Sequence, residues 1–343
     1  MNVLEVRGLS VEYAAPGGAV HAVSDVSLDL RRGEILGIAG ESGSGKSTLA
    51  HAMSRLLRPP AHVTAGAVRY RPPGDGEPVD VLTLDRAALR RFRWKELAIV
   101  FQSAMNSLNP VSTIGAQIDD VLRTHRTDMS KADRRERVVE LLGRVGIGAE
   151  RRRSYPHELS GGMRQRAVIA IALALNPEII VMDEPTTALD VVVQRDILHQ
   201  IKELKDEYGF AVVFITHDLS LLLEIADHIA IMYAGRIVET APARAMHEAP
   251  RHPYTLGLMR SFPKLHGPRE ELLGIPGTPP DLRSLPPGCA FQPRCRYAVD
   301  ACRSHRPDLL TADDGVQVAC ALYDASVYAG DLPAELSPRE ETR

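Results

Sequence analysis

The feature that most constrains this chain is a glycine-rich run near the N-terminus. It reads Gly40-Glu41-Ser42-Gly43-Ser44-Gly45-Lys46-Ser47-Thr48 and fits the pattern G-x-x-x-x-G-K-[ST] at every required position. The apolar run 34–39 before it predicts a buried strand. The run 49–57 after it has helical spacing, and Pro59-Pro60 ends that helix. A strand, a glycine-rich turn and a helix direct backbone N–H groups and the positive helix end at one point, which binds an anion such as a triphosphate.

The residues of this run have chemically distinct tasks. Lys46 reaches the β- and γ-phosphates, and the Ser47 hydroxyl holds Mg²⁺. The glycines keep side chains away from the phosphates. The alternative is a glycine-rich turn with an incidental lysine, and the flanking strand and helix make it much less favoured.

Composition and charge exclude several classes of protein. The 343 residues carry a net charge of −3, which gives no bulk attraction to nucleic acid or acidic lipid. The longest apolar run, 167–175, is too short to span a membrane. No basic region followed by an apolar core opens the chain, so we expect no signal peptide and a cytoplasmic protein.

Three further apolar runs, at 97–101, 179–184 and 211–215, predict buried strands with polar residues at their ends. Gln102 follows the first, Asp183 and Glu184 end the second, and His217 follows the third. Ligands of open α/β sheets bind at the carboxyl ends of strands. A carboxylate there can hold Mg²⁺, and its neighbour can orient or deprotonate an attacking water.

Other segments complete an α/β pattern. Strands at 4–13 and 20–30 predict an antiparallel pair, and strands at 228–233 and 236–240 end the sheet. Helices are expected at 86–96, 113–147 and 191–207. Tyr13 ends the first strand, where it can stack on a nucleotide base, although spacing alone favours an ordinary half-buried tyrosine.

A second anion site is indicated by Ser160-Gly161-Gly162, which opens a helix at 163–175. The same three residues also serve as an ordinary helix cap, so the pattern alone is weak.

The ordered set of motifs is far more specific than any one of them. The run Leu159-Ser160-Gly161-Gly162-Met163 precedes the Asp183-Glu184 pair, with Gln102 upstream and His217 downstream. The set resembles the nucleotide-binding subunits of ATP-binding cassette (ABC) transporters over residues 3 to about 250. The resemblance implies an α/β fold with a P-loop core sheet, an antiparallel β subdomain and a helical subdomain at about 103–165. It also implies an ABC domain at 1–250 and a C-terminal extension, regulatory or metal-binding, at 251–343.

The resemblance also implies roles for single residues. Glu184 is the catalytic base, and His217 bridges that base and the γ-phosphate. Mg²⁺ is held through Ser47, Gln102 and Asp183. Residues similar to those that contact ATP are Tyr13, Ser42, Gly43, Ser44, Gly45, Lys46, Ser47, Thr48 and Gln102. Residues similar to those that reach the partner subunit are Ser160, Gly161, Gly162 and Gln165 of the signature, and Asp190 of the D-loop.

The segment after the sheet narrows the resemblance to the ATPases of dipeptide and oligopeptide importers. The similar runs are 106–110, 251–258, 261–263, 275–282 and 287–295. Such importers imply a second, different ATPase subunit, two membrane permeases and an extracytoplasmic solute-binding protein, with this chain on the cytoplasmic face of the membrane. Nickel importers share the tail, so a nickel or other small-solute importer stays open.

All four cysteines, Cys289, Cys295, Cys302 and Cys320, lie in this tail. Disulfides are disfavoured in a reducing cytoplasm, and the tight Cys-x₂₋₄-Cys pair typical of structural zinc is missing. Loosely spaced thiolates suit a [4Fe–4S] cluster, and the resemblance agrees. Zinc and no metal remain as alternatives.

Two rival functions are less favoured. A soluble, non-transport ABC ATPase usually has two cassettes or a long coiled-coil insertion, and neither is present. A GTPase switch needs an Asn-Lys-x-Asp motif, which does not occur in the sequence.

Overall fold

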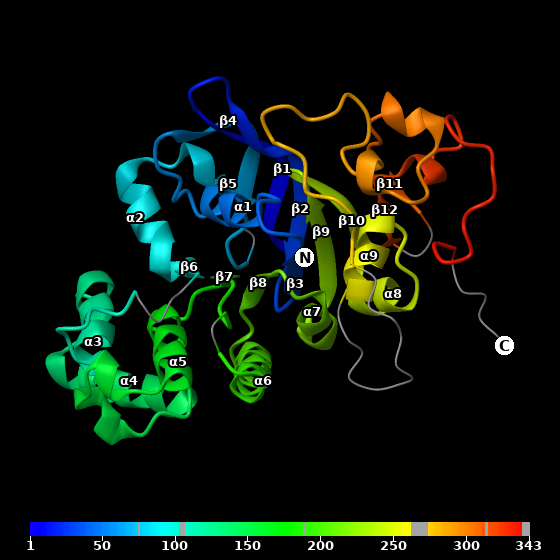
Figure 1. Cartoon of the computed structure of the whole chain (residues 1–343). Coiled ribbons are helices and arrows are strands. Elements are labelled where there is room, and N and C mark those ends of the chain that lie inside the picture. Colours follow the sequence, from blue (N-terminus) through cyan, green and yellow to red (C-terminus); the bar gives the residue numbers. More distant parts are fainter. Residues whose placement is uncertain (75, 103–106, 188, 262–273, 313–314, 338–343) are drawn as a thin grey trace. The chain divides into compact units, whose positions relative to one another are not determined.

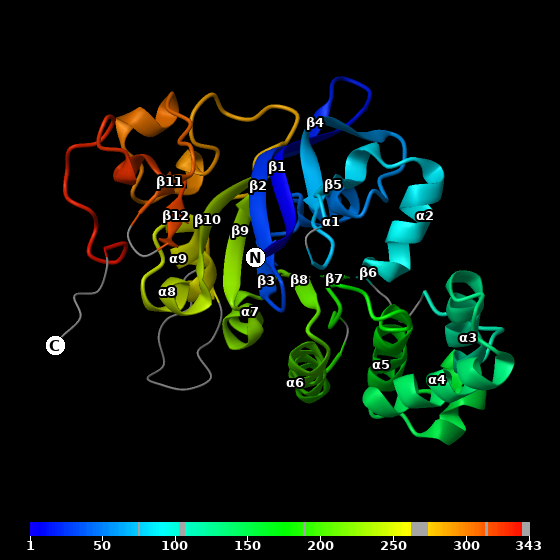
Figure 2. The ribbon, with the colours of Figure 1, turned by 180° about the vertical axis from the view of Figure 1, so that it is seen from behind.

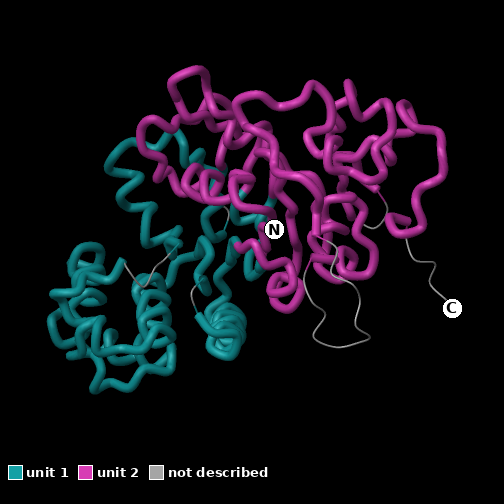
Figure 3. Tube along the Cα trace, viewed as in Figure 1, with its two compact units in different colours: residues 1–4, 29–35, 69–215 teal, residues 5–28, 36–68, 216–343 magenta. Residues whose placement is uncertain are grey.

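The computed structural model describes residues 1–343 except 75, 103–106, 188, 262–273, 313–314 and 338–343. The chain forms two compact units, coloured separately in Figure 3. Unit 1 contains residues 1–4, 29–35 and 69–215, and unit 2 contains residues 5–28, 36–68 and 216–343. The expected start of the helical subdomain at 103 and parts of the runs 106–110 and 261–263 lie outside the described residues.

Parallel strands form the core of unit 1. β7 (Ile179–Asp183) pairs with β6 (Leu97–Val100) on one side and with β8 (Ala211–Thr216) on the other. Every residue of β7 and β8 is buried, as expected for parallel strands that are covered on both faces. The carboxyl ends of β6 and β7 lie at one edge, and each is followed by predicted site residues. The predicted strands at 97–101, 179–184 and 211–215 are thus confirmed to within one residue.

The helices of unit 1 are α2 (Arg86–Lys95), α3 (Ile114–His125), α4 (Lys131–Arg144), α5 (Gly161–Ala172) and α6 (Val191–Tyr208). α3, α4 and α5 lie against one another, which Figure 1 and Figure 2 show from opposite sides. The prediction of one continuous helix at 113–147 was wrong, because the chain turns between α3 and α4. Ser130 caps α4 there in a reciprocal capping box with Asp133, which stabilises a new helix start.

Antiparallel strands open unit 2. β1 (Asn2–Tyr13) lies between β2 (Val20–Arg31) and β4 (Ala61–Tyr70), as the alternating pattern predicted for the first two. In unit 1 the last residues of β4 pair with β5 (Val79–Asp80). This sheet precedes and follows the glycine-rich run in the sequence.

The second sheet of unit 2 starts from β3 (Ile35–Ala39), which pairs in parallel with β9 (His228–Tyr233). β9 turns at Ala234-Gly235 into the antiparallel β10 (Arg236–Pro242). β12 (Gln317–Val318) then pairs with β10, and β11 (Leu310–Thr311) pairs with β12. The C-terminal extension therefore adds strands to the same sheet, as Figure 1 shows beside β10.

The helices of unit 2 are α1 (Lys46–Met53), α7 (Leu219–Ile225), α8 (Ala243–Glu248) and α9 (Pro253–Ser261). The predicted helix at 49–57 is misplaced. α1 starts at Lys46 because Gly45, at φ 102°, turns the chain into the helix, and it ends at Met53, before Arg55 adopts φ 53°. The extension has a small apolar core of its own, which contains Leu256, Val318, Cys320, Leu322 and Leu336.

Candidate functional site

The glycine-rich loop that follows β3 has a shape that only glycine permits at two positions. Gly40 and Gly45 have φ values of 155° and 102°. A Cβ at Gly40 would lie 2.2 Å from the Met232 carbonyl oxygen, and one at Gly45 would lie 2.1 Å from the Ala22 carbonyl oxygen. The loop therefore presses its backbone so closely against neighbouring strands that neither position has room for a side chain.

Lys46 places its ammonium inside this loop. Its side chain is buried, and Nζ donates to the carbonyl oxygens of Gly40 at 2.7 Å and Glu41 at 2.9 Å. Ser44 is also buried, whereas Ser42 and Gly43 are exposed and Ser47 and Thr48 are half-buried. A buried cation surrounded by backbone dipoles and at the start of a helix is the arrangement that binds a phosphate chain.

Two more predicted residues lie in unit 2. Tyr13 is half-buried, and its hydroxyl is hydrogen-bonded to the Thr48 hydroxyl at 3.1 Å. The end of β1 is thereby joined to the first turn of α1. His217 follows β8 with an exposed side chain, and the next residue, Asp218, caps α7 by accepting the Ser220 N–H.

In unit 1 the structure brings Gln102 and Glu184 together. Gln102 Nε2 donates to Glu184 Oε2 at 3.1 Å, and Thr187 Oγ1 lies 3.1 Å from the same oxygen. Asp183, the last residue of β7, is 1% exposed. Glu184 adopts φ 47°, a left-handed conformation that is costly for a side chain bearing a Cβ and is typical of functional sites.

The signature run also begins a helix in unit 1. Ser160 caps α5, and its hydroxyl accepts the Met163 N–H at 3.3 Å. Gly161 and Gly162 have no side chains that could cover the N–H groups of the first turn. Gln165, one turn further along α5, is buried. Asp190 caps α6 by accepting the Val193 N–H, and a Cβ at Gly162 would lie 2.6 Å from Val193 Cγ1. The signature and Asp190 therefore contact the same residue.

Known proteins are similar to this chain over most of its length. The ABC transporter family profile matches residues 23–187, and the oligopeptide/dipeptide transporter C-terminal region matches residues 238–302. A putative peptide import ATP-binding protein of Brucella ovis is 46% identical over 321 residues, covering 91% of this chain and 94% of that protein. The oligopeptide transport ATP-binding protein OppD of Salmonella typhimurium is 44% identical over 307 residues, covering 89% of each.

This chain belongs to the ATP-binding subunits of ABC transporters. It is an ATPase whose hydrolysis of ATP is coupled to transport. A solved ATP-binding cassette, dimeric and in a post-hydrolysis state with ADP and phosphate, has a TM-score of 0.61 and 30% identity. The match covers 70% of this chain and 99% of that one, which confirms the predicted ABC-type α/β fold. Among the described residues of this ABC ATPase, no helix is long and apolar enough to cross a membrane.

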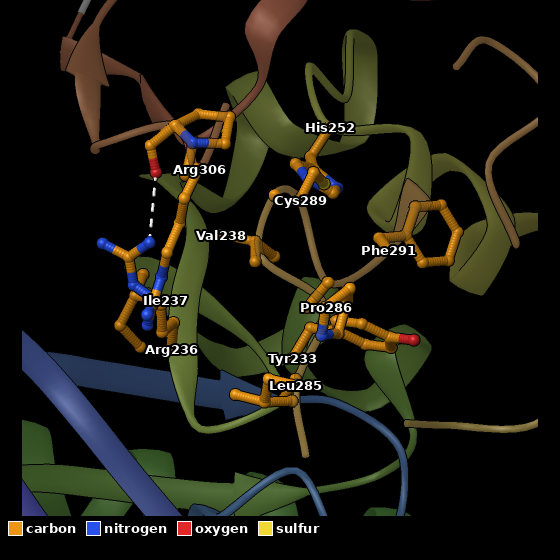
Figure 4. A pocket seen from close by; sticks show the side chains of 15 residues that line it. Tyr233, Arg236, Ile237, Val238, His252, Leu285, Pro286, Cys289, Phe291 and Arg306 are labelled. Carbon is orange, nitrogen blue, oxygen red and sulfur yellow. Dashed lines mark hydrogen bonds between the residues drawn. The ribbon is translucent and has the colours of Figure 1, made fainter. Parts of the chain in front are cut away.

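The four cysteines of the ABC ATPase converge on one small cavity. Cys289, Cys295, Cys302 and Cys320 are free thiols that all line it. The Cys289 N–H donates to the Cys302 carbonyl oxygen at 2.9 Å, which holds two of the cysteine segments together. Cys289 also lines a neighbouring cavity with His252 and Phe291, shown in Figure 4.

Burial dominates the chemistry of these thiols. It raises the pKa of Cys289, that of Cys295 to about 12, and that of Cys320 well above the ordinary thiol value. The neighbouring thiols raise each of these pKa values further. Within the described part of the chain, no three His, Cys, Asp or Glu side chains are grouped so that they could hold a metal ion. The four cysteines therefore share a cavity but do not form a set of metal ligands.

The sequence patterns gave no role to one residue of the phosphate loop and to two residues that contact it. Glu41 occupies a variable position of the loop pattern, so the pattern gave it no role. Arg294 and Tyr254, from the C-terminal extension, both hydrogen-bond to Glu41. The available signal was an arginine directly before a cysteine in the run 287–295, which spacing alone does not distinguish from a surface arginine.

Proposed function

We propose that this chain hydrolyses ATP to power the uptake of dipeptides or oligopeptides through an ABC importer. The observation that carries the peptide assignment is the match of the oligopeptide/dipeptide C-terminal region to residues 238–302, in the same chain as the ABC transporter match at 23–187. The two named relatives, one for peptide import and one for oligopeptide transport, support it over most of their length.

For the chemistry, we propose that Glu184 acts as general base toward the attacking water, with His217 bridging to the γ-phosphate. The Gln102 amide that donates to Glu184 supports this role, because it holds the carboxylate in one orientation. Lys46 and the loop, from Ser42 to Thr48, hold the phosphates. Tyr13 stacks on the base, and its hydrogen bond to Thr48 supports a position beside the loop.

A bound Mg²⁺ would neutralise charge on the phosphates. The residues proposed to hold it offer oxygen donors, which Mg²⁺ prefers: the Asp183 carboxylate, the Ser47 hydroxyl and the Gln102 amide oxygen. Asp183 fits because a carboxylate that is 1% exposed at a strand end is poorly solvated and gains most from a cation.

For the assembly, we propose a head-to-tail pair with a second ATPase subunit, as a heterodimer. Ser160, Gly161, Gly162 and Gln165 of the signature, together with Asp190, would then serve the partner's nucleotide. Gly162 and Asp190 both contact Val193, which supports the proposal that the signature and Asp190 form one surface facing the partner subunit. Two permease subunits and an extracytoplasmic solute-binding protein complete the importer, with this chain on the cytoplasmic face of the membrane.

We also propose a functional division near residue 250, with an ABC domain at 1–250 that includes a helical subdomain at about 103–165. The extension at 251–343 is a regulatory or metal-binding element. The separate family matches at 23–187 and 238–302 support two parts, although β12 of the extension completes the sheet of the first.

At the cysteines we propose a [4Fe–4S] cluster, with zinc as the alternative. Support comes from the four thiols, which line one cavity. Because burial raises the pKa of Cys289, Cys295 and Cys320, metal loading must release protons from these three thiols. It must also draw the four cysteine side chains together. The cluster would then fasten a segment that has little regular structure.

Uptake in cells tests the transport proposal. A strain that lacks this chain should lose import of labelled dipeptides and pentapeptides while importing nickel normally. The wild-type chain should restore peptide uptake, and the Glu184→Gln variant should not. Loss of nickel uptake with intact peptide uptake would instead assign the chain to a nickel importer.

A further inference from the structure

Residues of the C-terminal extension hold the phosphate loop at Glu41, through its side chain and its backbone. Arg294 Nη1 donates to Glu41 Oε2 at 2.7 Å, and Arg294 Nη2 donates to Glu41 Oε1 at 2.9 Å. The Arg294 side chain is 5% exposed. This is the two-pronged geometry in which a guanidinium fixes the orientation of a carboxylate as well as its position.

The backbone of Glu41 is fixed at the same time. Its N–H donates to the Tyr254 hydroxyl at 2.7 Å, and its carbonyl oxygen accepts from Lys46 Nζ at 2.9 Å. The residue that Arg294 and Tyr254 hold is therefore one of those that hold the phosphate-binding lysine. A shift of Glu41 would move an acceptor that positions Lys46.

Arg294 is itself rigidly placed. Its Nε donates to the Pro276 carbonyl oxygen at 2.8 Å, and Nη1 donates to the Tyr233 hydroxyl at 3.3 Å. The ring centroid of Tyr233 lies 4.6 Å from that of Tyr254 and 5.3 Å from that of Phe291. Tyr233 and Phe291 both line the cavity in Figure 4. Arg294 therefore lies beside a group of packed aromatic side chains. The hydrogen bonds to Glu41 raise the pKa of Arg294, which keeps its charge fixed.

We propose that Arg294 is a positioning residue for nucleotide binding. It acts through Glu41 on the phosphate loop and touches no nucleotide itself. Because Arg294 directly precedes Cys295, any rearrangement of the cysteine segment reaches the phosphate loop through this pair. The proposal rests on the assignment of Lys46 to the phosphates, and it adds a contribution from the extension to the affinity for ATP.

Binding of ATP to the full-length chain tests it. Arg294→Met should raise the Kd for MgATP about tenfold, equivalent to about 1.4 kcal/mol, because the loop loses the guanidinium that orients Glu41. Arg294→Lys should rescue only in part, since an ammonium cannot bind both carboxylate oxygens in the same way. Arg296→Met is the matched control. It lies two positions away and removes a half-exposed ion pair with Glu335, so its Kd should equal that of the wild type.

A double-mutant cycle separates positioning from general damage. If the two residues act as one unit, Glu41→Gln with Arg294→Met should bind ATP no more weakly than Arg294→Met alone. In the assembled importer the Arg294 variants should raise KM for ATP with little change in kcat, the pattern of lost binding. Should Arg294→Met not fold, Glu41→Gln breaks the same pair from the other side and gives the same readouts.

Three outcomes would overturn the proposal: a folded Arg294→Met with wild-type Kd, additive effects in the cycle, or an equal loss in Arg296→Met. Lys46→Ala tests the underlying assignment separately. If Lys46→Ala binds ATP as the wild type does, the phosphate-loop assignment fails. If Lys46→Ala loses binding and Arg294→Met does not, only the positioning role fails.

Discussion

Gln102 Nε2 donates a hydrogen bond to Glu184 Oε2 at 3.1 Å. The donor comes from the segment after β6, and the acceptor comes directly after β7, the neighbouring parallel strand. Thr187 Oγ1 lies 3.1 Å from the same Glu184 oxygen. Because Glu184 also adopts φ 47°, backbone and side chain together set the direction of this carboxylate.

This geometry makes the Glu184→Gln variant informative. An amide cannot accept the proton of the attacking water, so kcat for ATP hydrolysis in the assembled importer should fall about 10²–10⁴-fold. Binding of ATP should be kept, and the ATP-bound pair should persist. The measurements are phosphate release and size-exclusion chromatography with ATP. Glu203→Gln, an exposed position on α6, is the control. Turnover near the wild-type rate would remove Glu184 from the role of base.

The glycines of the phosphate loop should differ in their tolerance of alanine. Gly45→Ala would place a Cβ 2.1 Å from the Ala22 carbonyl oxygen, whereas a Cβ at Gly43 meets nothing within 4 Å. Both residues have positive φ, so backbone strain of about 1–2 kcal/mol is common to both. Binding of MgATP, measured by calorimetry, should be abolished in Gly45→Ala and only weakened in Gly43→Ala. Equal affinities in the two variants would show that the close contact at Gly45 does not govern the loop.

Local pattern predicted the strands and the loop well because these elements are set by neighbours in sequence. Buried parallel strands are continuous apolar runs, and the loop needs glycine at defined positions. The break between α3 and α4 was missed because charged residues continue through it. Only the capping box of Ser130 and Asp133 marks the new start.

Long-range features could not be predicted in this way. β11 and β12 have two residues each, too short for any periodicity, and they exist because β10 offers an edge. Glu41 and Arg294 are 253 residues apart, and nothing near either one indicates the other. The four cysteines were recognised as a cluster, but spacing does not tell whether thiols are already gathered around a metal.

Assembly should control activity. The chain carries one phosphate loop and one signature, and the proposed arrangement places the signature over a partner's nucleotide. The purified chain at low concentration should therefore hydrolyse ATP poorly, and activity should rise when the second ATPase and the permeases are added. Ser160→Arg, which fills the start of α5 with bulk, should suppress that rise while leaving ATP binding by the same chain unchanged. Robust hydrolysis by a strictly monomeric sample would contradict the shared-site arrangement.

The cavity lined by the four cysteines should give the protein a measurable colour. Anaerobically purified protein should be brown, with broad absorbance near ~400 nm that air bleaches, because this is the absorbance expected of the proposed [4Fe–4S] cluster. Cys302→Ser removes a buried thiol of the proposed cluster site and should lose the colour and the iron measured by elemental analysis. Limited proteolysis should then cut more readily within residues 285–325, since the segment loses its fastening, while ATP binding is retained. Ser304→Ala, exposed and two residues away, is the control and should keep both colour and protease resistance. A colourless anaerobic sample with one zinc per chain would show that the cysteines bind zinc and not an iron–sulfur cluster. A metal-free sample that still resists protease would show that no metal fastens this segment.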